Sequence, residues 1–228
     1  MARDTLTQEH IVLTAIELLD EEGLEGLNMR SLGKRLNSAA TAVYWHVKNK
    51  DNLVLLCGDH VWHEVALPDP AAVGWRAAAT TLATGLHAML GRHPWLVPAF
   101  GTYLFYGPGK ARYDDLCLAV YEEAGFTGPE ADRAAATVFT FVLGSALGSA
   151  ATASLNRRLG RDGGDPDELI AQTMAKATEV AQRFPRLRAR LEAPESLEYA
   201  SGPERTFEFG LQMLLGGLEA ELAGRGAR

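Results

Sequence analysis

Apolar side chains in this chain recur every three to four residues, and no segment keeps the two-residue alternation of a half-buried strand. Ile11, Ala15 and Leu18 give this spacing near the start, and it returns in segment after segment toward the C-terminus. Glycines, prolines and capping residues separate the segments. The sequence therefore predicts an all-α fold.

Three short helices are predicted in succession at the N-terminus. Thr7 is placed to cap a helix that ends at Gly23. Asn28 is placed to cap a second helix, which runs to about Leu36. A third helix is expected over about residues 39–47.

The rest of the chain predicts longer helices, with a domain boundary where the fourth helix begins. Asp51 is expected to cap this fourth helix, which stops before Pro68. The later helices are expected over residues 75–91, a short segment opened by Pro94, 110–124, 129–158, 167–184 and 203–223. Residues 185–202 are predicted as a loop with at most one irregular turn. The two expected domains are residues 1–50 and 51–228.

Residues 27–50 carry the clearest functional pattern. They hold five basic residues and no acidic one, in a chain whose net charge is −7. A positive segment in an acidic protein indicates a polyanion partner at that surface. Because the second and third helices lie here, joined by a tight turn, the segment predicts a helix-turn-helix that binds duplex DNA. An ordinary helical hairpin with a solvated basic face is the alternative.

Three features of this segment favour the DNA-binding interpretation. Gly33 lies mid-helix, where glycine costs about 1 kcal/mol relative to alanine, and it would let the third helix cross closely. Asn37 tolerates the left-handed conformation that ends the second helix. The third helix opens with small side chains, which allow its N-terminus deep into a major groove.

The candidate DNA contacts follow from the reach of each side chain. An arginine can make a bidentate contact to guanine, and alanine or threonine methyls can touch thymine. The base-reading candidates are Arg30, Ala40, Thr41 and Ala42. The phosphate-binding candidates are Tyr44, His46 and Lys50. Trp45 is instead expected to pack between the first, third and fourth helices.

Residues 134–155 carry no charge and are long enough to span a bilayer. Small residues dominate the run, and no aromatic or Lys/Arg belt flanks it, so it is predicted to be a core or subunit-interface helix. The polar N-terminus lacks the apolar core of a signal peptide. Cys57 and Cys117 lie in apolar helical patterns, as reduced thiols do. We therefore expect a cytoplasmic protein with no membrane partner and no cofactor.

Residues 7–65 contain the runs EEGLEGL, MRSLGKRL and AVYWHVKNKDNL. In these runs the chain resembles the TetR family of bacterial repressors, and YWHVKNK is especially similar to the tetracycline-repressor subgroup. The run FEFGLQMLLGGLEAEL resembles the final helix of that subgroup, which pairs two subunits. The resemblance implies a homodimer that binds a palindromic DNA operator and is released by a small-molecule effector.

The chain departs from that subgroup at two places. Ala40 and Thr41 stand where the subgroup has glutamine and proline, which implies a different operator sequence. Ala99 stands where the subgroup places a histidine that holds drug-bound magnesium. Magnesium–tetracycline is therefore not the expected effector, and no metal site is expected.

The larger predicted domain is rich in aromatic residues, which form either plain core or a pocket for a flat, largely apolar effector. The short helix within residues 94–109 would be easy to displace, as a ligand switch needs. The candidate effector contacts are His63, Leu86, Met89, Trp95, Phe100, Thr102, Tyr103, Tyr113, Cys117 and Phe139. The histidines are not accompanied by enough other ligating residues to complete a metal site, so they are predicted to be structural or pocket residues.

The last helix keeps an apolar stripe, and residues 144–149 are small, so two copies of each could form a four-helix seam in a dimer. Burial within one subunit is the alternative. No phosphate-binding glycine loop, GxSxG or HExxH motif is present, so an enzyme is not expected. The predicted function is a ligand-responsive transcriptional repressor. A DNA-binding activator or a ligand-independent regulator of the same fold is the alternative.

Overall fold

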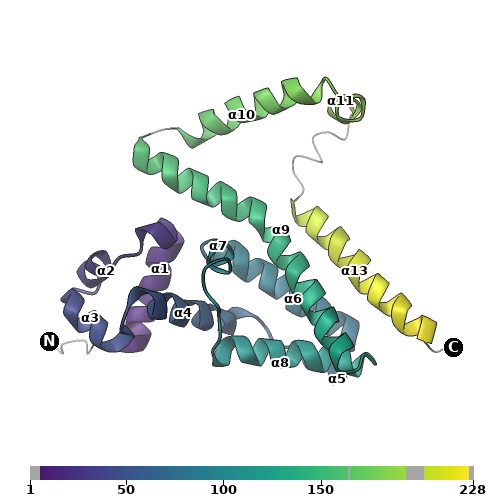
Figure 1. Cartoon of the computed structure of the whole chain (residues 1–228), viewed down its shortest axis with the longest axis horizontal. Coiled ribbons are helices and arrows are strands. Elements are labelled where there is room, and N and C mark those ends of the chain that lie inside the picture. The colour runs from purple at the N-terminus through teal and green to yellow at the C-terminus, as the bar shows by residue number, and fades with distance from the viewer. Residues whose placement is uncertain (1–5, 164, 194–202, 226–228) are drawn as a thin grey trace.

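The computed structural model describes residues 6–163, 165–193 and 203–225. Within these residues every regular element is a helix, so the predicted all-α fold is confirmed. Figure 1 shows a small N-terminal head beside a larger body, with residues 166–192 standing away from that body. The head comprises the first three helices, and the body begins with the fourth.

The head consists of α1 (Gln8–Gly26), α2 (Met29–Arg35) and α3 (Ala40–Val47). As predicted, Thr7 and Asn28 cap the first two helices, because their side chains accept hydrogen bonds from the backbone N–H groups of His10 and Ser31. Gly23 has a φ of 72°, so α1 kinks at its predicted end before one further turn. Apolar faces of all three helices close a common core, to which the fully buried residues Ile11, Leu18, Leu19, Leu32, Val43 and Val47 contribute.

The fourth helix, α4 (Lys50–Val61), carries the chain from the head into the body and ends in a 3-10 turn, η1 (Trp62–Glu64). Its cap is Asn49, whose Oδ1 accepts a hydrogen bond from the backbone N–H of Asn52 at 2.7 Å. The predicted cap at Asp51 is therefore wrong. Asn49 has the extended backbone that a cap needs, whereas Asp51 already lies in the first turn, where its carboxylate suits the positive end of the helix.

The body contains α5 (Pro70–Val73), α6 (Trp75–Arg92), α7 (Leu96–Ala99), α8 (Pro108–Glu123) and α9 (Pro129–Asp162). The long helices α6, α8 and α9 pack on one another. Pro108 and Pro129 open α8 and α9 at the first helical position, where the missing N–H of proline has no partner to lose.

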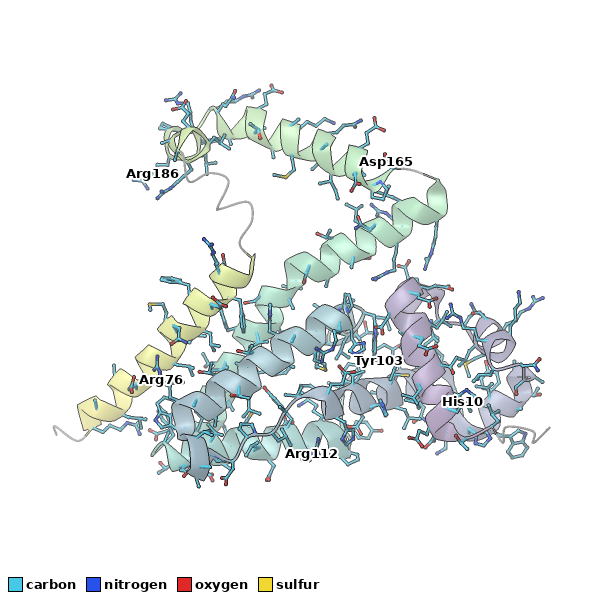
Figure 2. All side chains as sticks on the ribbon, turned by 180° about the vertical axis from the view of Figure 1, so that it is seen from behind. His10, Arg76, Tyr103, Arg112, Asp165 and Arg186 are labelled. Atoms are coloured by element: carbon cyan, nitrogen blue, oxygen red, sulfur yellow. The ribbon has the colours of Figure 1, made fainter. Side chains whose placement is uncertain are left out.

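The C-terminal part contains α10 (Pro166–Ala181), α11 (Pro185–Glu192) and α13 (Pro203–Arg225). The loop predicted over residues 185–202 is wrong in its first half, where α11 forms; residues 194–202 lie outside the described residues. Pro185 suits the first position of α11, and the leucine, arginine, alanine and glutamate residues that follow favour a helix. Figure 2 shows the side chains from Asp165 to Arg186 standing apart from the body.

The final helix, α13, returns to the body and lies along α9 and α6. Phe207, Leu211 and Leu215 form its buried stripe. Arg76 of α6 donates hydrogen bonds to the side chains of Glu219 and Gln212, both at 3.0 Å (Figure 2). One face of α13 is thus part of the body of the same subunit.

The uncharged run predicted as a core or interface helix lies in α9. The segment Pro129–Arg161 is, among the described residues, the one helix long and apolar enough to cross a membrane by length and composition. Its buried side chains recur every four residues, at Ala134, Val138, Val142, Ala146 and Ala150. Leu147 is exposed on the single chain, as are the small residues Gly144, Gly148 and Ser149 near it. One face of α9 therefore belongs to the core, and the other is open.

Candidate functional site

Six of the seven predicted DNA-binding residues lie on α2 and α3, and the seventh, Lys50, is the first residue of α4. Arg30, Thr41, Tyr44 and His46 are exposed, and Ala40 and Ala42 are half-buried. Val43 and Val47 on the opposite side of α3 are fully buried. The apolar side of α3 therefore fixes the helix to the head, while its polar side faces outward.

The turn between α2 and α3 has the predicted geometry. Asn37 has a φ of 48°, in the left-handed region that ends a helix. A Cβ placed on Gly33 would lie 2.8 Å from the carbonyl oxygen of Ser38 and 3.3 Å from the backbone nitrogen of Ala40. Glycine is therefore needed for the start of α3 to approach α2 so closely.

The end of α3 and the start of α4 are tied to α1. Gln8 Nε2 donates to the carbonyl oxygen of His46 at 3.0 Å, and Lys50 Nζ donates to the carbonyl oxygen of Leu24 at 2.8 Å. An ammonium group has three donors, so this bond leaves Lys50 able to meet a phosphate as well. Its phosphate-binding role stays a prediction, as do the roles of the other candidates on this surface.

The prediction that Trp45 packs between helices is wrong, because 88% of this residue is exposed. Val43 and Val47, four residues apart, mark the inward side of α3, and Trp45 lies between them on the outward side. The helical spacing alone could have placed it there. Trp45 therefore adds a large aromatic group to the outer surface of the head.

A cavity of about 300 Å³ lies in the body between α6, α8 and α9. Its walls are mostly apolar, from residues such as Leu82, Ala83, Val138 and Phe139. This volume is at the lower end of the roughly 300–1,000 Å³ typical of small-molecule sites.

Three of the ten predicted effector contacts line this cavity, namely Tyr113, Cys117 and Phe139. Leu86, Met89 and Trp95 are fully buried core residues, whereas His63 and Thr102 are exposed. Tyr103 donates its hydroxyl to Asp51 at 3.2 Å, and the Phe100 ring lies edge-on to Phe105 and Phe139. These seven residues do not line the cavity, and an effector role for any of the ten stays a prediction.

The structure adds polar wall residues that the sequence interpretation missed: Lys110, Asp114, Tyr121, Asp132 and Thr140. Burial raises the pKa of Cys117 to about 12, and burial likewise raises the pKa of Tyr113 and of Tyr121. These hydroxyl and thiol groups therefore keep their protons at neutral pH and can act as hydrogen-bond donors. The cavity is apolar with a small polar set, mostly from α8.

A cluster of charged side chains joins the head to the body at His93. Its Nδ1 lies 2.8 Å from Asp20 Oδ1 of α1, and its Nε2 lies 2.8 Å from Glu64 Oε1 at the end of η1. Trp95 donates its indole N–H to the same Asp20 oxygen at 2.8 Å, and Arg92 donates to Glu64. The cluster thus connects three parts of the chain that are far apart in sequence.

The charge of His93 follows from this geometry. Burial alone would lower its pKa, but the hydrogen bonds and negative charges of Asp20 and Glu64 outweigh burial and raise the pKa above its ordinary value. For the acid Glu64 the effect of burial is opposite, since burial alone would raise its pKa. Hydrogen bonds from His93 and Arg92 outweigh burial and hold the pKa of Glu64 below its ordinary value. When His93 is protonated, it forms ion pairs with Asp20 of the head and Glu64 of the body.

A second connection joins α4 to α8. The backbone N–H of Lys110, in the first turn of α8, donates to Asp59 Oδ1 of α4 at 3.0 Å. A Cβ on Gly109 would lie 2.3 Å from the carbonyl oxygen of Asp59, so the two helices touch here through their backbones. The helix α4 therefore contacts α8 on one side and leads into the head at its other end.

Within the described residues, no three His, Cys, Asp or Glu side chains cluster as metal ligands would. The rings of His60 and His63 are 6.2 Å apart and edge-on, and His93 is held by the two carboxylates described above.

Comparison with known proteins gives two family matches. Residues 11–57 match the family described as bacterial regulatory proteins, tetR family. Residues 67–222 match the family described as tetracyclin repressor-like, C-terminal domain. The second match alone covers more than half of the chain.

Individual relatives agree with these matches. The transcriptional repressor DrrR1 of Streptomyces coeruleorubidus is 32% identical over 226 residues, which cover 98% of this chain and 81% of the relative. An HTH-type transcriptional regulator of Saccharopolyspora erythraea is 37% identical over 140 residues, 61% of this chain and 59% of that relative. Among solved structures, Streptomyces coelicolor ActR in complex with actinorhodin has a TM-score of 0.76 at 27% identity, over 96% of this chain and 98% of ActR.

Proposed function

Because the chain belongs to the TetR family of bacterial transcriptional regulators, whose members bind DNA and are not enzymes, we propose that it is a ligand-responsive repressor. In this proposal a homodimer binds a palindromic operator in the cytoplasm and leaves it when a small, largely aromatic effector enters the cavity. Residues 1–50 would bind DNA, and residues 51–228 would bind the effector and the second subunit.

The observation that carries the proposal is the connection between an outward-facing helix and an internal cavity. The exposed side of α3 offers small, polar and aromatic side chains that can contact DNA in the major groove and along its backbone. The cavity is walled by α8, and α8 holds α4 through Asp59. An effector that displaces α8 would therefore move the head.

A small movement of the heads is enough to end operator binding. A twofold dimer places its two reading helices in successive major grooves, about 34 Å apart. A shift of a few ångströms in that spacing loses base contacts on one half-site. The effector would then act by stabilising the spacing that does not fit the operator.

The open faces of α9 and α13 support the dimer. Leu147 of α9 and Phe209 and Met213 of α13 are large apolar residues that are exposed on the single chain. Both helices also carry exposed glycines that permit close approach, among them Gly144, Gly148 and Gly217. A second copy of the same two helices would cover these residues in a four-helix seam.

The test begins with selection of bound sequences from a random DNA pool by the purified protein. We expect a palindrome and, in a gel shift, release of that DNA by compounds that bind the cavity. Substitution of Arg30→Ala should weaken binding about 10- to 100-fold, whereas Arg112→Ala, an exposed arginine on α8, should not. Selected sequences without twofold symmetry, or a complex that no cavity ligand weakens, would contradict the proposal.

A further inference from the structure

Lys110 lies at the cavity wall among aromatic rings. Its Nζ is 5.5 Å from the ring centroid of Trp62 and 5.6 Å from that of Phe139, and its side chain is 19% exposed. Among the described residues, Lys110 Nζ donates a hydrogen bond to Asp114 Oδ2 at 2.5 Å. Because an ammonium group has three donors, Lys110 can bind a further oxygen atom on the cavity side.

Other donors line the same cavity. Tyr113, Cys117 and Tyr121 come from the same helix as Lys110 and keep their protons at neutral pH, as described above. Thr140 adds a hydroxyl from α9. These groups, together with the lysine, offer the cavity more donors than a neutral hydrocarbon ligand could use.

The buried indole of Trp62 adds an unsatisfied donor beside Lys110. This residue is fully buried, and its Nε1 has no hydrogen-bond partner among the described residues. Its ring lies 4.8 Å from that of Tyr113 and beneath the Lys110 ammonium. A buried N–H without an acceptor is costly. Trp62 does not itself line the cavity, but it packs directly behind Lys110 and Tyr113, which do.

Two aspartates also line the cavity, but they lie toward solvent. The side chain of Asp114 is 48% exposed, and Asp132 is exposed at the start of α9. Ion pairs made at such exposed positions contribute little, because water screens them. An anion that reaches Lys110 among the rings is shielded from water, so it forms the stronger pair. The cavity therefore favours an anionic ligand over a cationic one.

We propose that the effector is a planar aromatic molecule bearing a carboxylate or phenolate, and that Lys110 binds this anionic oxygen in place of Asp114. The inference rests on the proposed function, since it takes this cavity as the effector site. The aromatic part lies against Phe139 and the apolar wall, while the freed Asp114 turns to solvent.

Lys110 would then both bind the effector and connect α8 to α4. The ammonium of Lys110 binds the effector, and its backbone N–H binds Asp59 of α4 at 3.0 Å. A ligand that draws Lys110 inward pulls on the first turn of α8, where Gly109 lies in backbone contact with Asp59. The anionic group thus acts at the contact that holds the head-bearing helix.

The experiment compares three ligands of one shape and different charge. Isothermal titration of the full-length protein with 2-naphthoate, 2-naphthamide and 2-naphthylmethylammonium gives the affinity of each. We expect the carboxylate to bind about tenfold more tightly than the amide, and the ammonium ion to bind most weakly. In Lys110→Gln the carboxylate and the amide should bind about equally, and Lys110→Arg should restore the preference.

Matched variants separate ligand binding from structural damage. Asp114→Asn leaves the lysine without its resting partner and should keep or increase the preference for the carboxylate. The double variant Lys110→Gln/Asp114→Asn leaves no unpaired carboxylate and should still lose the preference, with unchanged affinity for the amide. Circular dichroism of each variant verifies the fold.

Three results would overturn the inference: the ammonium ligand binds most tightly, Lys110→Gln retains the preference for the carboxylate, or none of the three ligands binds the wild-type protein. Operator binding, measured separately on selected DNA, tests the proposed function. A wild-type protein that prefers naphthoate but binds no DNA would contradict the proposed function and leave the ligand preference standing.

Discussion

At the residue scale, the charge of His93 decides how firmly the head is held. Both of its ring nitrogens face carboxylate oxygens at 2.8 Å. A neutral imidazole has one N–H and can donate to only one of them, whereas the imidazolium donates to both. Protonation of His93 and attachment of α1 to the body are therefore linked.

This linkage predicts the direction of a pH effect on stability. A raised pKa means that the stabilisation is complete below the ordinary histidine pKa of about 6.5 and is lost as the pH rises through the raised value. Substitution of His93→Gln should lower the free energy of unfolding by roughly 1 kcal/mol more at pH 6 than at pH 9. Urea denaturation at a series of pH values measures this difference.

The matching control is His10→Gln, an exposed histidine of α1, which should change stability little at any pH. Glu64 determines the loss of stability at acid pH. Because its pKa is lowered in the folded state, its contribution to the free energy of unfolding is lost as the pH falls through that lowered pKa. Stability curves of wild type and His93→Gln that run parallel from pH 6 to pH 9 would contradict the role given to His93.

Gly33 offers a second test at this scale. Alanine would favour the helix by about 1 kcal/mol, but its Cβ would stand 2.8 Å from a backbone oxygen that cannot rotate away. We expect Gly33→Ala to destabilise the head by about 1–3 kcal/mol, as overpacking does. Gly91→Ala in α6, where a Cβ meets no atom within 4 Å, should be neutral or stabilising. Equal effects of the two substitutions in thermal melts would count against the close turn.

Residue-level predictions succeeded where the cause is local. The caps at Thr7 and Asn28 and the left-handed Asn37 depend on a few neighbouring residues, which the sequence displays. Lys110 could not be found in this way, because its place beside Trp62 depends on how the end of α4 meets α8. Its position in the first turn of a helix is, in sequence, that of any solvated lysine.

At the element scale, the contact of α4 with α8 connects a wall of the cavity to the helix that leads into the head. Asp59→Ala removes the acceptor at the first turn of α8 and should lower the free energy of unfolding by about 0.5–2 kcal/mol, as loss of a helix cap does. It should also raise the effector concentration needed to release DNA. Denaturation and a gel-shift titration measure the two effects.

Asp115→Ala is the control for this substitution, because Asp115 is an exposed carboxylate on α8, the other helix of this contact. It should alter neither quantity. If Asp59→Ala lowers stability but leaves the effector requirement unchanged, the contact is structural and the signal takes another route.

The sequence predicted most helices but fewer of the contacts between them. Spacing and breakers predicted α6, α8 and α9 to within a few residues at most ends, since an apolar stripe of that length is unambiguous. Leu86 and Met89 of α6 were predicted as effector contacts, yet both are fully buried core residues that do not line the cavity. Periodicity gives the inward side of a helix, whereas a cavity depends on where three helices fail to fill the space between them.

At the scale of the whole molecule, the open sides of α9 and α13 predict that the protein pairs. Substitution of Leu147→Glu or Met213→Glu would bury a negative charge in the proposed dimer seam without an opposite charge to pair with it. We expect wild type to sediment as a dimer and either variant as a monomer, with helical circular dichroism retained. Analytical ultracentrifugation distinguishes the two states.

Leu104→Glu is the control, because Leu104 is 88% exposed and lies in the segment between α7 and α8, outside the proposed seam. It should leave the dimer intact. A wild-type protein that sediments as a monomer at micromolar concentration, or seam variants that remain dimeric, would contradict the assignment of α9 and α13.

Because one face of α9 is open on the single chain, the amount of dimer would depend steeply on gene dosage. If one side of this helix is covered only by another copy of the chain, the amount of functional regulator is set by a mass-action balance between free and paired molecules. Below the dissociation constant of that balance, halving the cellular supply of the polypeptide leaves only about a quarter of the pairs. Growth and cell division would then relieve repression more steeply than simple dilution does.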